Sequence, residues 1–560
     1  MRKLLLSAMM TLALPAAAQQ FDNLPDPIED VNKVVDNTPD SIAKALMSRP
    51  KPGSTRSGSN PVLFLVGNST MRNGTLGNGN NGQWGWGYFA NKYFNPSRIS
   101  VENQALGGMS TRTFYNQLWP AIRQALKPGD WVIISIGHND NGPFDSGRAR
   151  AVKPGTGTDS MVVTIQETGV KETVYTYGGY MRRYIAECRE KGAHPILMSL
   201  TPRNAYDDNG KIVRKPQGAW LEEIAREQHV PYVDLNEISG QKLDAYGKWK
   251  ESYHFYGDNI HTSLFGAEMN ARSAAEGLAR SNDPALAPLQ DMMQNVALPV
   301  VDVKREKGKP VVFITGDSTV KNKDKDKDGM WGWGSQAYTV FDAKKVTCVN
   351  EAMAGRSTRT YLREGRWEKI YNSLQPGDYV LIEFGHNDIC PIDDQKERGV
   401  IPGTADTSHV YKMKATGRYE VVYSFGWYLK KFIQDVREKG ATPILVSLTP
   451  RNEWPGGRIE RRDGSYGKWY REVVAETGVE FLDLHNISAD FLDKKFANKK
   501  VEKETDKDKR KAMEEKCKSK ASKYFNHDHT HTSLKGAQLN AKSVAKGLRD
   551  INSSLAKYLK

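Results

Sequence analysis

Cysteine is scarce in this chain, with only four among 560 residues: Cys188, Cys348, Cys390 and Cys517. Cys188 is alone in its half of the chain, and the spacing of the other three leaves a disulfide among them open. A Cys-x-x-Cys pair and a His/Cys cluster are both absent, so we expect no zinc site and no cofactor. After the first 14 residues the sequence also lacks an apolar run long enough to span a bilayer.

The first 18 residues have the pattern of an export signal. Arg2 and Lys3 form a charged start, Leu4–Leu14 is a short apolar run, and Ala16–Ala18 offers a small-residue cleavage site. No Cys stands at that cleavage site, so a lipid anchor is not expected. The sequence therefore predicts a bacterial protein of the periplasm or the exterior, with no membrane anchor.

Acidic residues are outnumbered, and the formal net charge is +14. Such a balance favours an acidic partner such as an anionic polysaccharide, although a simply solvated surface explains it better because lysines are distributed along both halves. No nucleic-acid-binding motif is recognisable, so nucleic acid is not an expected partner. The densest charge run, residues 494–523, mixes Lys with Glu and Asp and reads as an exposed helical insertion.

What the chain does contain is a long internal repeat. Gly-His-Asn-Asp occurs at Gly137–Asp140 and again at Gly385–Asp388, about 248 residues later. A repeat of that length is a whole domain rather than a solenoid unit, and 560 residues exceed the size of a single core. Other blocks double at nearly the same offset: GNST at 67–70 with GDST at 316–319, WGWG at 84–87 and 331–334, STRT at 110–113 and 357–360, and PIL-x-SLTPRN at 195–204 and 443–452.

Each half alternates short apolar strands with amphipathic helices of about a dozen residues, such as Tyr175–Lys191 and Tyr423–Lys439. This alternation is typical of a parallel sheet with helices on both faces, where active sites lie beyond the carboxyl ends of the strands. We predict a signal peptide over 1–18, a polar segment and linker over 19–60, a first α/β domain over 61–285, a linker over 286–308 and a second α/β domain over 309–560.

Residue types suited to nucleophilic catalysis recur in the same order in both halves. A serine follows the first strand, a glycine the second and an asparagine the third, and Asp-x-x-His stands near each end. Serine needs a basic His, a carboxylate fixes that imidazole, and backbone N–H and Asn amide groups can hold an oxyanion. The candidates are Ser69, Gly108, Asn139, Asp258 and His261 in the first half, and Ser318, Gly355, Asn387, Asp528 and His531 in the second.

Together these blocks resemble the SGNH, or GDSL-like, hydrolase superfamily, and more narrowly its rhamnogalacturonan acetylesterases. The resemblance is carried by GDST, WGWG, NEAMAGRSTRT at 350–360, FGHND at 384–388 and DHTHTS at 528–533, with NQALGGMSTRT at 103–113 and DNIHTS at 258–263 in the first half. It implies two tandem flavodoxin-like three-layer α/β/α domains with parallel sheets. It also implies a Ser/Asp/His triad, no metal cofactor, and removal of acetyl groups from acidic plant polysaccharide or oligosaccharide.

Some candidates have competing explanations. The indoles of Trp84, Trp86, Trp331 and Trp333 could stack on sugar rings or simply pack. Arg112 and Arg359 could hold a galacturonate carboxylate or stabilise the STRT helix. Residues 324–329 begin like a calcium loop, but Ser335 replaces the expected twelfth-position Glu.

One difference between the halves bears on activity. Asn68 stands where the second half and the family have Asp, at Asp317. We expect both sites to be active and the second to be stronger. The alternatives are an acetylesterase acting on xylan or another acyl ester, and a carbohydrate-binding protein with one degenerate esterase domain.

Overall fold

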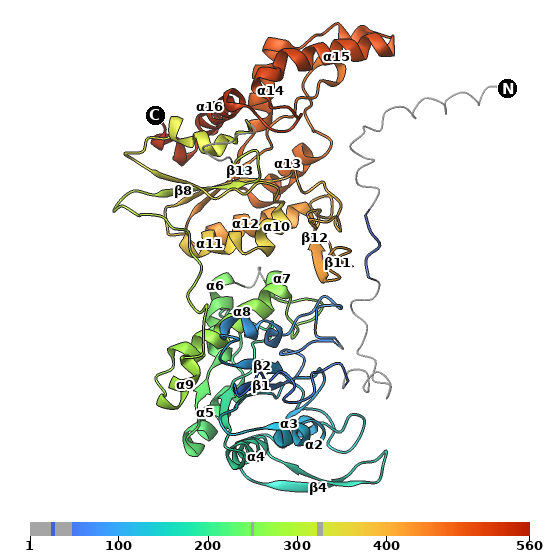
Figure 1. Ribbon diagram of the computed structural model, residues 1–560, viewed down its shortest axis with the longest axis vertical. Helices are drawn as coiled ribbons and strands as arrows, with labels where there is room; N and C mark the ends of the chain where they lie inside the picture. The colour runs from blue at the N-terminus through green and yellow to red at the C-terminus, as the bar shows by residue number, and fades with distance from the viewer. Residues whose placement is uncertain (1–23, 29–46, 75, 248–250, 322–328) are drawn as a thin grey trace, which may run out of the picture. The chain divides into compact units, whose positions relative to one another are not determined.

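The computed structural model describes residues 24–28, 47–74, 76–247, 251–321 and 329–560 (Figure 1). The predicted signal peptide and the calcium-like loop at 324–328 lie outside these residues. The break between two compact units falls between Leu298 and Pro299.

The first unit is built on a five-stranded, all-parallel sheet in the order β2-β1-β3-β6-β7. Its inner strand β1 is buried at every position, as expected for a strand covered on both faces. The strands are β1 (Val62–Gly67), β2 (Ser100–Asn103), β3 (Trp131–Ser135), β6 (His194–Met198) and β7 (Tyr232–Val233).

The second unit repeats this sheet in the order β9-β8-β10-β13-β14, again with all strands parallel. Read along the chain, both orders are 2-1-3-4-5, the flavodoxin-like arrangement. The predicted fold class is therefore confirmed. The strands are β8 (Val311–Gly316), β9 (Thr347–Asn350), β10 (Tyr379–Glu383), β13 (Thr442–Val446) and β14 (Glu480–Leu482).

Helices connect the strands and cover both faces of each sheet (Figure 1). In the first unit they are α2 (Thr111–Gln117), α3 (Trp119–Ala125), α4 (Tyr177–Glu190), α5 (Pro216–Gln228), α6 (Leu235–Tyr246), α7 (Glu251–His254), α8 (Leu264–Arg280) and α9 (Ala287–Gln290). In the second they are α10 (Thr358–Arg363), α11 (Arg366–Ser373), α12 (Phe425–Glu438), α13 (Tyr466–Thr477), α14 (Leu484–Phe496), α15 (Lys507–Ala521) and α16 (Leu534–Asp550). Short 3-10 helices are η2 (Trp86–Tyr88), η3 (Ala90–Tyr93), η5 (Pro284–Leu286), η6 (Trp333–Thr339), η7 (Pro455–Gly457), η8 (Val501–Lys503), η9 (Ser522–Tyr524) and η10 (Ser554–Tyr558).

Two antiparallel hairpins were not predicted. They are β4 (Ser160–Thr164) with β5 (Lys171–Tyr175), and β11 (Ser408–Lys412) with β12 (Tyr419–Tyr423). Each leads directly into α4 or α12, which therefore begins two residues after the predicted start. The densest charge run does form a helix, α15, but its Cys517 and Ala521 are buried against the rest of the unit.

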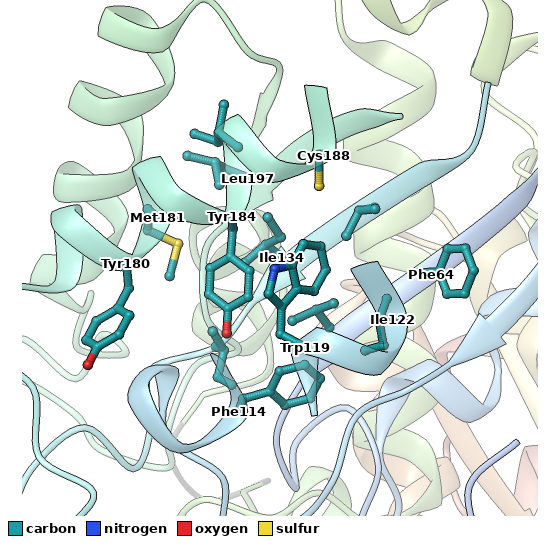
Figure 2. Packing of buried hydrophobic residues seen from close by; sticks show 14 of the residues in the cluster. Phe64, Phe114, Trp119, Ile122, Ile134, Tyr180, Met181, Tyr184, Cys188 and Leu197 are labelled. Carbon is teal, nitrogen blue, oxygen red and sulfur yellow. The ribbon is translucent and has the colours of Figure 1, made fainter. Parts of the chain in front are cut away.

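The first sheet has a separate core on each face because successive side chains of a strand point to opposite sides. Phe64 and Ile134 pack against Trp119 and Tyr184 of α3 and α4 (Figure 2). On the other face, Leu65 belongs to a cluster that includes Trp86 and residues of α8. Both faces of the sheet are thus closed, and only its ends are left for a site.

The segments predicted as linkers are tied to the sheets. Arg56 forms a forked pair with buried Asp130 at 2.6 and 2.8 Å, and Arg305 contacts Asp378 in the same way at 2.7 and 3.1 Å. Leu286 and Leu289, inside the second predicted linker, are buried in the first unit's core. We therefore place the domain boundary near Leu298 instead of residue 285.

Candidate active sites

A tight turn after the first strand of each unit carries the candidate nucleophile. In the first unit, Asn68 Oδ1 accepts hydrogen bonds from Thr70 N at 3.2 Å and Thr70 Oγ1 at 3.0 Å. In the second, Asp317 Oδ1 accepts the equivalent bonds from Thr319, both at 2.8 Å. The intervening serine, Ser69 or Ser318, is thereby held at the carboxyl end of the sheet. Asn performs this anchoring as Asp does.

The candidate triads assemble in both units with the same geometry. His261 Nε2 lies 2.8 Å from Ser69 Oγ, and its Nδ1 lies 2.6 Å from Asp258 Oδ2. The corresponding distances are 2.8 Å from His531 to Ser318 and 2.6 Å from His531 to Asp528. The structure therefore brings together all six residues as two triads.

Asp and His, three residues apart, can both reach the same site because the carboxylate also accepts hydrogen bonds from the backbone of its own loop. Asp258 Oδ1 accepts hydrogen bonds from the backbone N–H of Ile260 at 2.8 Å and of His261 at 2.7 Å. Although burial raises it, the pKa of Asp258 is held below its usual range by the His261 ring and these amides. The pKa of Asp528 is lowered in the same way. Both carboxylates are ionised and able to orient the imidazole.

The loop that contains WGWG in each domain is hydrogen-bonded to the loop that contains the candidate histidine. Trp84 N donates to Thr262 O at 2.9 Å, and Thr262 Oγ1 returns a bond to Trp84 O at 2.7 Å. Trp331 N donates to Thr532 O at 2.8 Å in the second unit. One residue further, Ser263 caps α8 and Ser533 caps α16. Each catalytic candidate His is thus fixed between a strand-like bridge and a helix start.

The glycine and asparagine expected to hold an oxyanion lie on the neighbouring loops. Gly108 has φ +80° and Gly355 has φ +74°, conformations that residues with a side chain rarely adopt. A Cβ built on Gly107 would lie 3.6 Å from the Cβ of Ser69, so this turn is next to the serine. Asn139 Nδ2 donates to Met109 O at 3.0 Å, which fixes the amide against the same turn.

Asp140 and Asp388 were missed as functional positions. Each is buried and binds the first residue of the STRT helix: Thr111 N and Oγ1 at 2.8 and 2.6 Å in one unit, Thr358 N and Oγ1 at 3.0 and 2.5 Å in the other. Burial raises the pKa of Asp140 to about 6 and that of Asp388 to about 7. The sequence contained a signal for this contact, because GHND and STRT occur together in both halves and are hydrogen-bonded to each other.

His138 and His386 position the GHND loop and do not transfer protons. Burial lowers the pKa of His138 to about 3 and that of His386 well below its usual value, so both rings are neutral. Nε2 lies 3.2 Å from Thr201 Oγ1 in the first unit and 3.2 Å from Thr449 Oγ1 in the second.

A buried glutamate distinguishes the second site. Glu383, at the end of β10, accepts hydrogen bonds from Thr319 Oγ1 at 3.0 Å and from the Trp333 indole at 2.5 Å. Burial, with the nearby Asp317 charge, raises the pKa of Glu383 to about 8. Ser135 takes this position in the first unit, where the Trp86 indole N–H has no partner within the described chain. Sequence reasoning missed Glu383, although the contrast of WVIIS with YVLIE pointed to it.

Three of the four candidate tryptophans are structural. Trp84, Trp86 and Trp333 are 4%, 2% and 1% exposed, so their faces are already covered by protein and cannot stack on a sugar. Trp331 is half-buried beside the second histidine loop. The expectation of sugar stacking is therefore retained for Trp331 alone.

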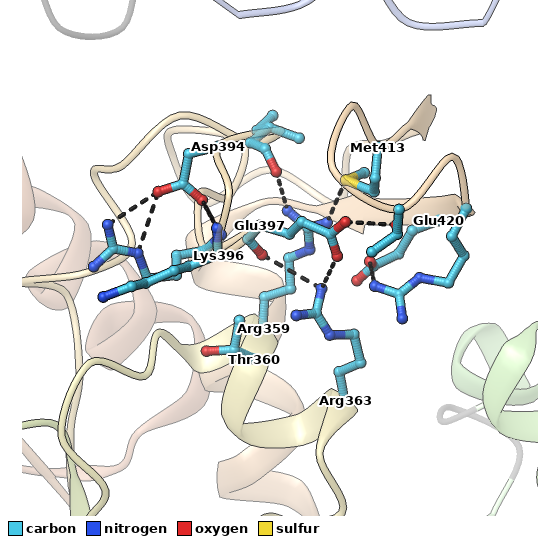
Figure 3. Close-up of polar contacts among 12 residues, drawn as sticks. Arg359, Thr360, Arg363, Asp394, Lys396, Glu397, Met413 and Glu420 are labelled. Atoms are coloured by element: carbon cyan, nitrogen blue, oxygen red, sulfur yellow. Dashed lines mark hydrogen bonds and ion pairs between the residues drawn. The ribbon is translucent and has the colours of Figure 1, made fainter.

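Arg112 and Arg359 do not face a substrate either. They are 0% and 1% exposed. Arg112 forms a forked pair with Glu172, with both bonds at 2.7 Å, and donates to Phe144 O at 2.8 Å. Arg359 donates to two backbone carbonyls at 2.8 Å and contacts Met413 (Figure 3). Both arginines hold the loop after GHND, so the expected carboxylate contact is corrected to a structural role.

Neither unit shows a metal centre or a membrane span in the described residues. No group of three or more His, Cys, Asp or Glu side chains there is arranged to hold a metal ion. Among the helices described, none is long and apolar enough to cross a membrane.

Comparison with known proteins gives the same repeated pattern. The model of the GDSL-like Lipase/Acylhydrolase family matches residues 65–269 and again residues 314–539. The chain is 28% identical to the rhamnogalacturonan acetylesterase of Emericella nidulans over 258 residues, which is 46% of this chain and 91% of that protein. It is 34% identical to rhamnogalacturonan acetylesterase RhgT of Bacillus subtilis over 178 residues, 31% of this chain and 66% of that protein. The crystal structure of YxiM from Bacillus subtilis has a TM-score of 0.31 at 25% identity, covering 40% of this chain and 57% of that one.

Proposed function

Because the chain belongs to the GDSL-like lipase/acylhydrolase family, we propose that both of its domains are serine esterases that remove O-acetyl groups from pectic polysaccharide. The observation that carries the proposal is the 2.8 Å contact between serine and histidine, present in both domains and backed by Asp258 or Asp528. The acetylesterase names of the relatives and the positive net charge support an acidic carbohydrate substrate.

In the proposed acylation, Ser69 Oγ attacks the acetyl carbonyl carbon while His261 Nε2 takes the hydroxyl proton. Asp258 stabilises the imidazolium that forms. The carbonyl oxygen becomes an oxyanion, for which the N–H groups of Ser69 and Gly108 and the amide of Asn139 are the available donors. Each such donor contributes on the order of 10²–10³ in rate.

Collapse of this intermediate breaks the bond to the sugar oxygen, which receives the proton from His261 and leaves as an alcohol. An acetyl ester on Ser69 remains. Water then attacks that ester, with His261 accepting a proton from the water, and acetate departs as the serine is restored. Ser318, Asp528 and His531 carry out the same steps in the second domain, with Gly355 and Asn387 as donors.

The site of action follows from the same proposal. Polysaccharide is an extracellular substrate, and the first 18 residues have the composition of an export signal. We therefore place the mature enzyme in the periplasm or outside the cell.

Acetate release tests the function. Purified protein is incubated with acetylated rhamnogalacturonan, acetylated xylan and an aryl acetate, and released acetate is measured. We expect the pectic substrate to have the highest kcat/KM. A clear preference for xylan would replace the proposed substrate, and failure to release acetate from any ester would reject the esterase assignment.

A further inference from the structure

Two arginines stand at the oxyanion glycine of the first site. A Cβ built on Gly108 would lie 2.2 Å from Nη2 of Arg148, so the guanidinium rests directly on this glycine. Arg150 Nη1 donates to Gly108 O at 3.4 Å. A Cβ built on the adjacent Gly107 would lie 3.6 Å from the Cβ of Ser69, so both positive charges lie on the turn beside that serine.

Within the described residues, neither guanidinium forms an ion pair with a carboxylate. Arg148 is exposed and forms no hydrogen bond or ion pair within the described part of the chain. Partial desolvation of the guanidinium and the repulsion from Arg150 lower the pKa of Arg148. The carboxylate of Asp140 interacts electrostatically with Arg150, but it is buried and already accepts a hydrogen bond from Thr111. Two neighbouring guanidinium groups without a counter-ion favour an anionic ligand.

The second site differs at both corresponding positions. Arg398, which corresponds to Arg150, binds Asp394 at 3.0 and 3.3 Å, and Figure 3 shows the bonds that Asp394 accepts. The first domain has Ser146 in place of Asp394. Arg356, next to Gly355, is bound by Glu364 at 3.0 and 3.1 Å. Lys396 replaces Arg148, and the space beside Gly355 is open.

We propose that Arg148 and Arg150 form a carboxylate subsite, so that the first domain prefers an acetylated sugar chain with a free uronic acid next to the acetyl ester. This inference rests on the proposed esterase function of Ser69. The planar guanidinium of Arg148 can bind a carboxylate through two parallel N–H bonds, which a lysine cannot do. The second domain, where Arg398 is paired with Asp394 and a lysine replaces Arg148, lacks this preference.

The test isolates each site and changes only the substrate's charge. Ser318→Ala leaves the first site, and Ser69→Ala leaves the second. The substrates are an acetylated oligogalacturonide with free carboxylates and the same compound with methyl-esterified carboxylates. In the Ser318→Ala protein the free acid should have the higher kcat/KM. Arg148→Gln should lower the ratio of free acid to methyl ester about tenfold, mainly through KM.

Matched variants separate recognition from folding. Lys396→Gln in the Ser69→Ala protein should leave the free-acid to methyl-ester ratio within about twofold, since that lysine is exposed and lacks the forked guanidinium. Arg148→Lys should restore part of the ratio in the first site, and added salt should reduce it. If Arg148→Gln lowered kcat/KM equally on both substrates, or left the ratio unchanged, Arg148 would not bind the substrate carboxylate.

Direct binding distinguishes the two proposals. Calorimetry with the free-acid oligosaccharide and the Ser69→Ala, Ser318→Ala double variant needs no catalysis. Charge-dependent binding that Arg148→Gln weakens about tenfold, without any Ser69-dependent hydrolysis, would keep the subsite and reject the esterase. Hydrolysis with no effect of Arg148→Gln on binding would keep the esterase and reject the subsite. Loss of both signals would reject both.

Discussion

Asp317 accepts a hydrogen bond from the side-chain amide of Asn387 at 3.4 Å, whereas Nδ2 of Asn68 has no partner in the described chain. Both residues otherwise bind the following threonine in the same way. The Asp/Asn difference between the domains therefore concerns the link to Asn387, and the serine turn itself is equally supported in both.

Removing the two serines should divide the activity between the sites. We expect Ser318→Ala to cost more turnover than Ser69→Ala on acetylated rhamnogalacturonan. The double variant should lose at least about 10³-fold, since the nucleophile is essential to the triad. Acetate release is the readout, with circular dichroism to confirm the fold. A harmless Ser318→Ala combined with an inactive Ser69→Ala would reverse the predicted ranking of the sites.

The role of Asp317 can be separated into its two contacts. In the Ser69→Ala background, Asp317→Asn keeps an oxygen for Thr319 and should lower kcat less than about tenfold. Asp317→Ala removes both bonds to Thr319 and should lower kcat by at least about 100-fold through misplacement of Ser318. Similar losses of kcat for the two variants would mean that activity depends on the negative charge of Asp317 and not on its bonds to Thr319.

Glu383 should make the second domain less stable as pH rises. The unfolded chain releases this proton near the ordinary glutamate pKa, whereas the folded domain keeps it until about pH 8. The unfolded state is therefore favoured progressively over that interval, by up to about 1.4 kcal/mol per pH unit. Glu383→Gln should remove this loss and gain stability relative to the wild type between about pH 5 and pH 8.

Thermal unfolding across that pH range measures the effect. The exposed Glu502 supplies a control, because Glu502→Gln should follow the wild-type curve. A Glu383→Gln curve parallel to the wild type would indicate that Glu383 ionises normally in the folded protein.

Arg112 should contribute to stability and not to substrate binding. Its replacement by Met leaves the Phe144 carbonyl without its donor and Glu172 with only the bond from Asn116, and should cost about 2–4 kcal/mol of unfolding free energy. Denaturant unfolding checks the loss. If the Arg112→Met protein had normal stability and a raised KM for the acidic oligosaccharide, Arg112 would be a substrate-binding residue.

Activity should be independent of divalent metal. The Ser/His pair generates its own nucleophile, so no metal-bound water is required for the proposed steps. Dialysis against EDTA should leave acetate release unchanged. A large loss restored by calcium or zinc would instead assign a role to Asp324, Asp326 and Asp328.

The catalytic candidates could be predicted because the chemistry fixes residue types and the repeat supplied each one twice. Ser69 and His261 are 192 residues apart in sequence, yet both follow recognisable blocks at the carboxyl end of the same sheet. The parallel sheets followed from the alternation of apolar strands and helices.

Burial of polar side chains could not be predicted. Arg112 looks like a carboxylate ligand in sequence, but its helix faces inward and Glu172 arrives from a hairpin that local patterns did not reveal. The tryptophans were ambiguous for a similar reason, since an indole face covers a core as well as it covers a sugar. Arg148 escaped notice because its significance depends on the fold placing it over Gly108.

The separation of Ser69 from His261 also has a consequence for synthesis. The nucleophile emerges near the start of its domain and the base near the end, 192 residues later, and the second pair is 213 residues apart. At about 5–20 residues per second, the first triad lacks its base for roughly 10–40 seconds of translation. A chain terminated before His261 would carry a serine without a histidine and be inert, so that hydrolytic capacity is acquired in two discrete steps as each domain is finished.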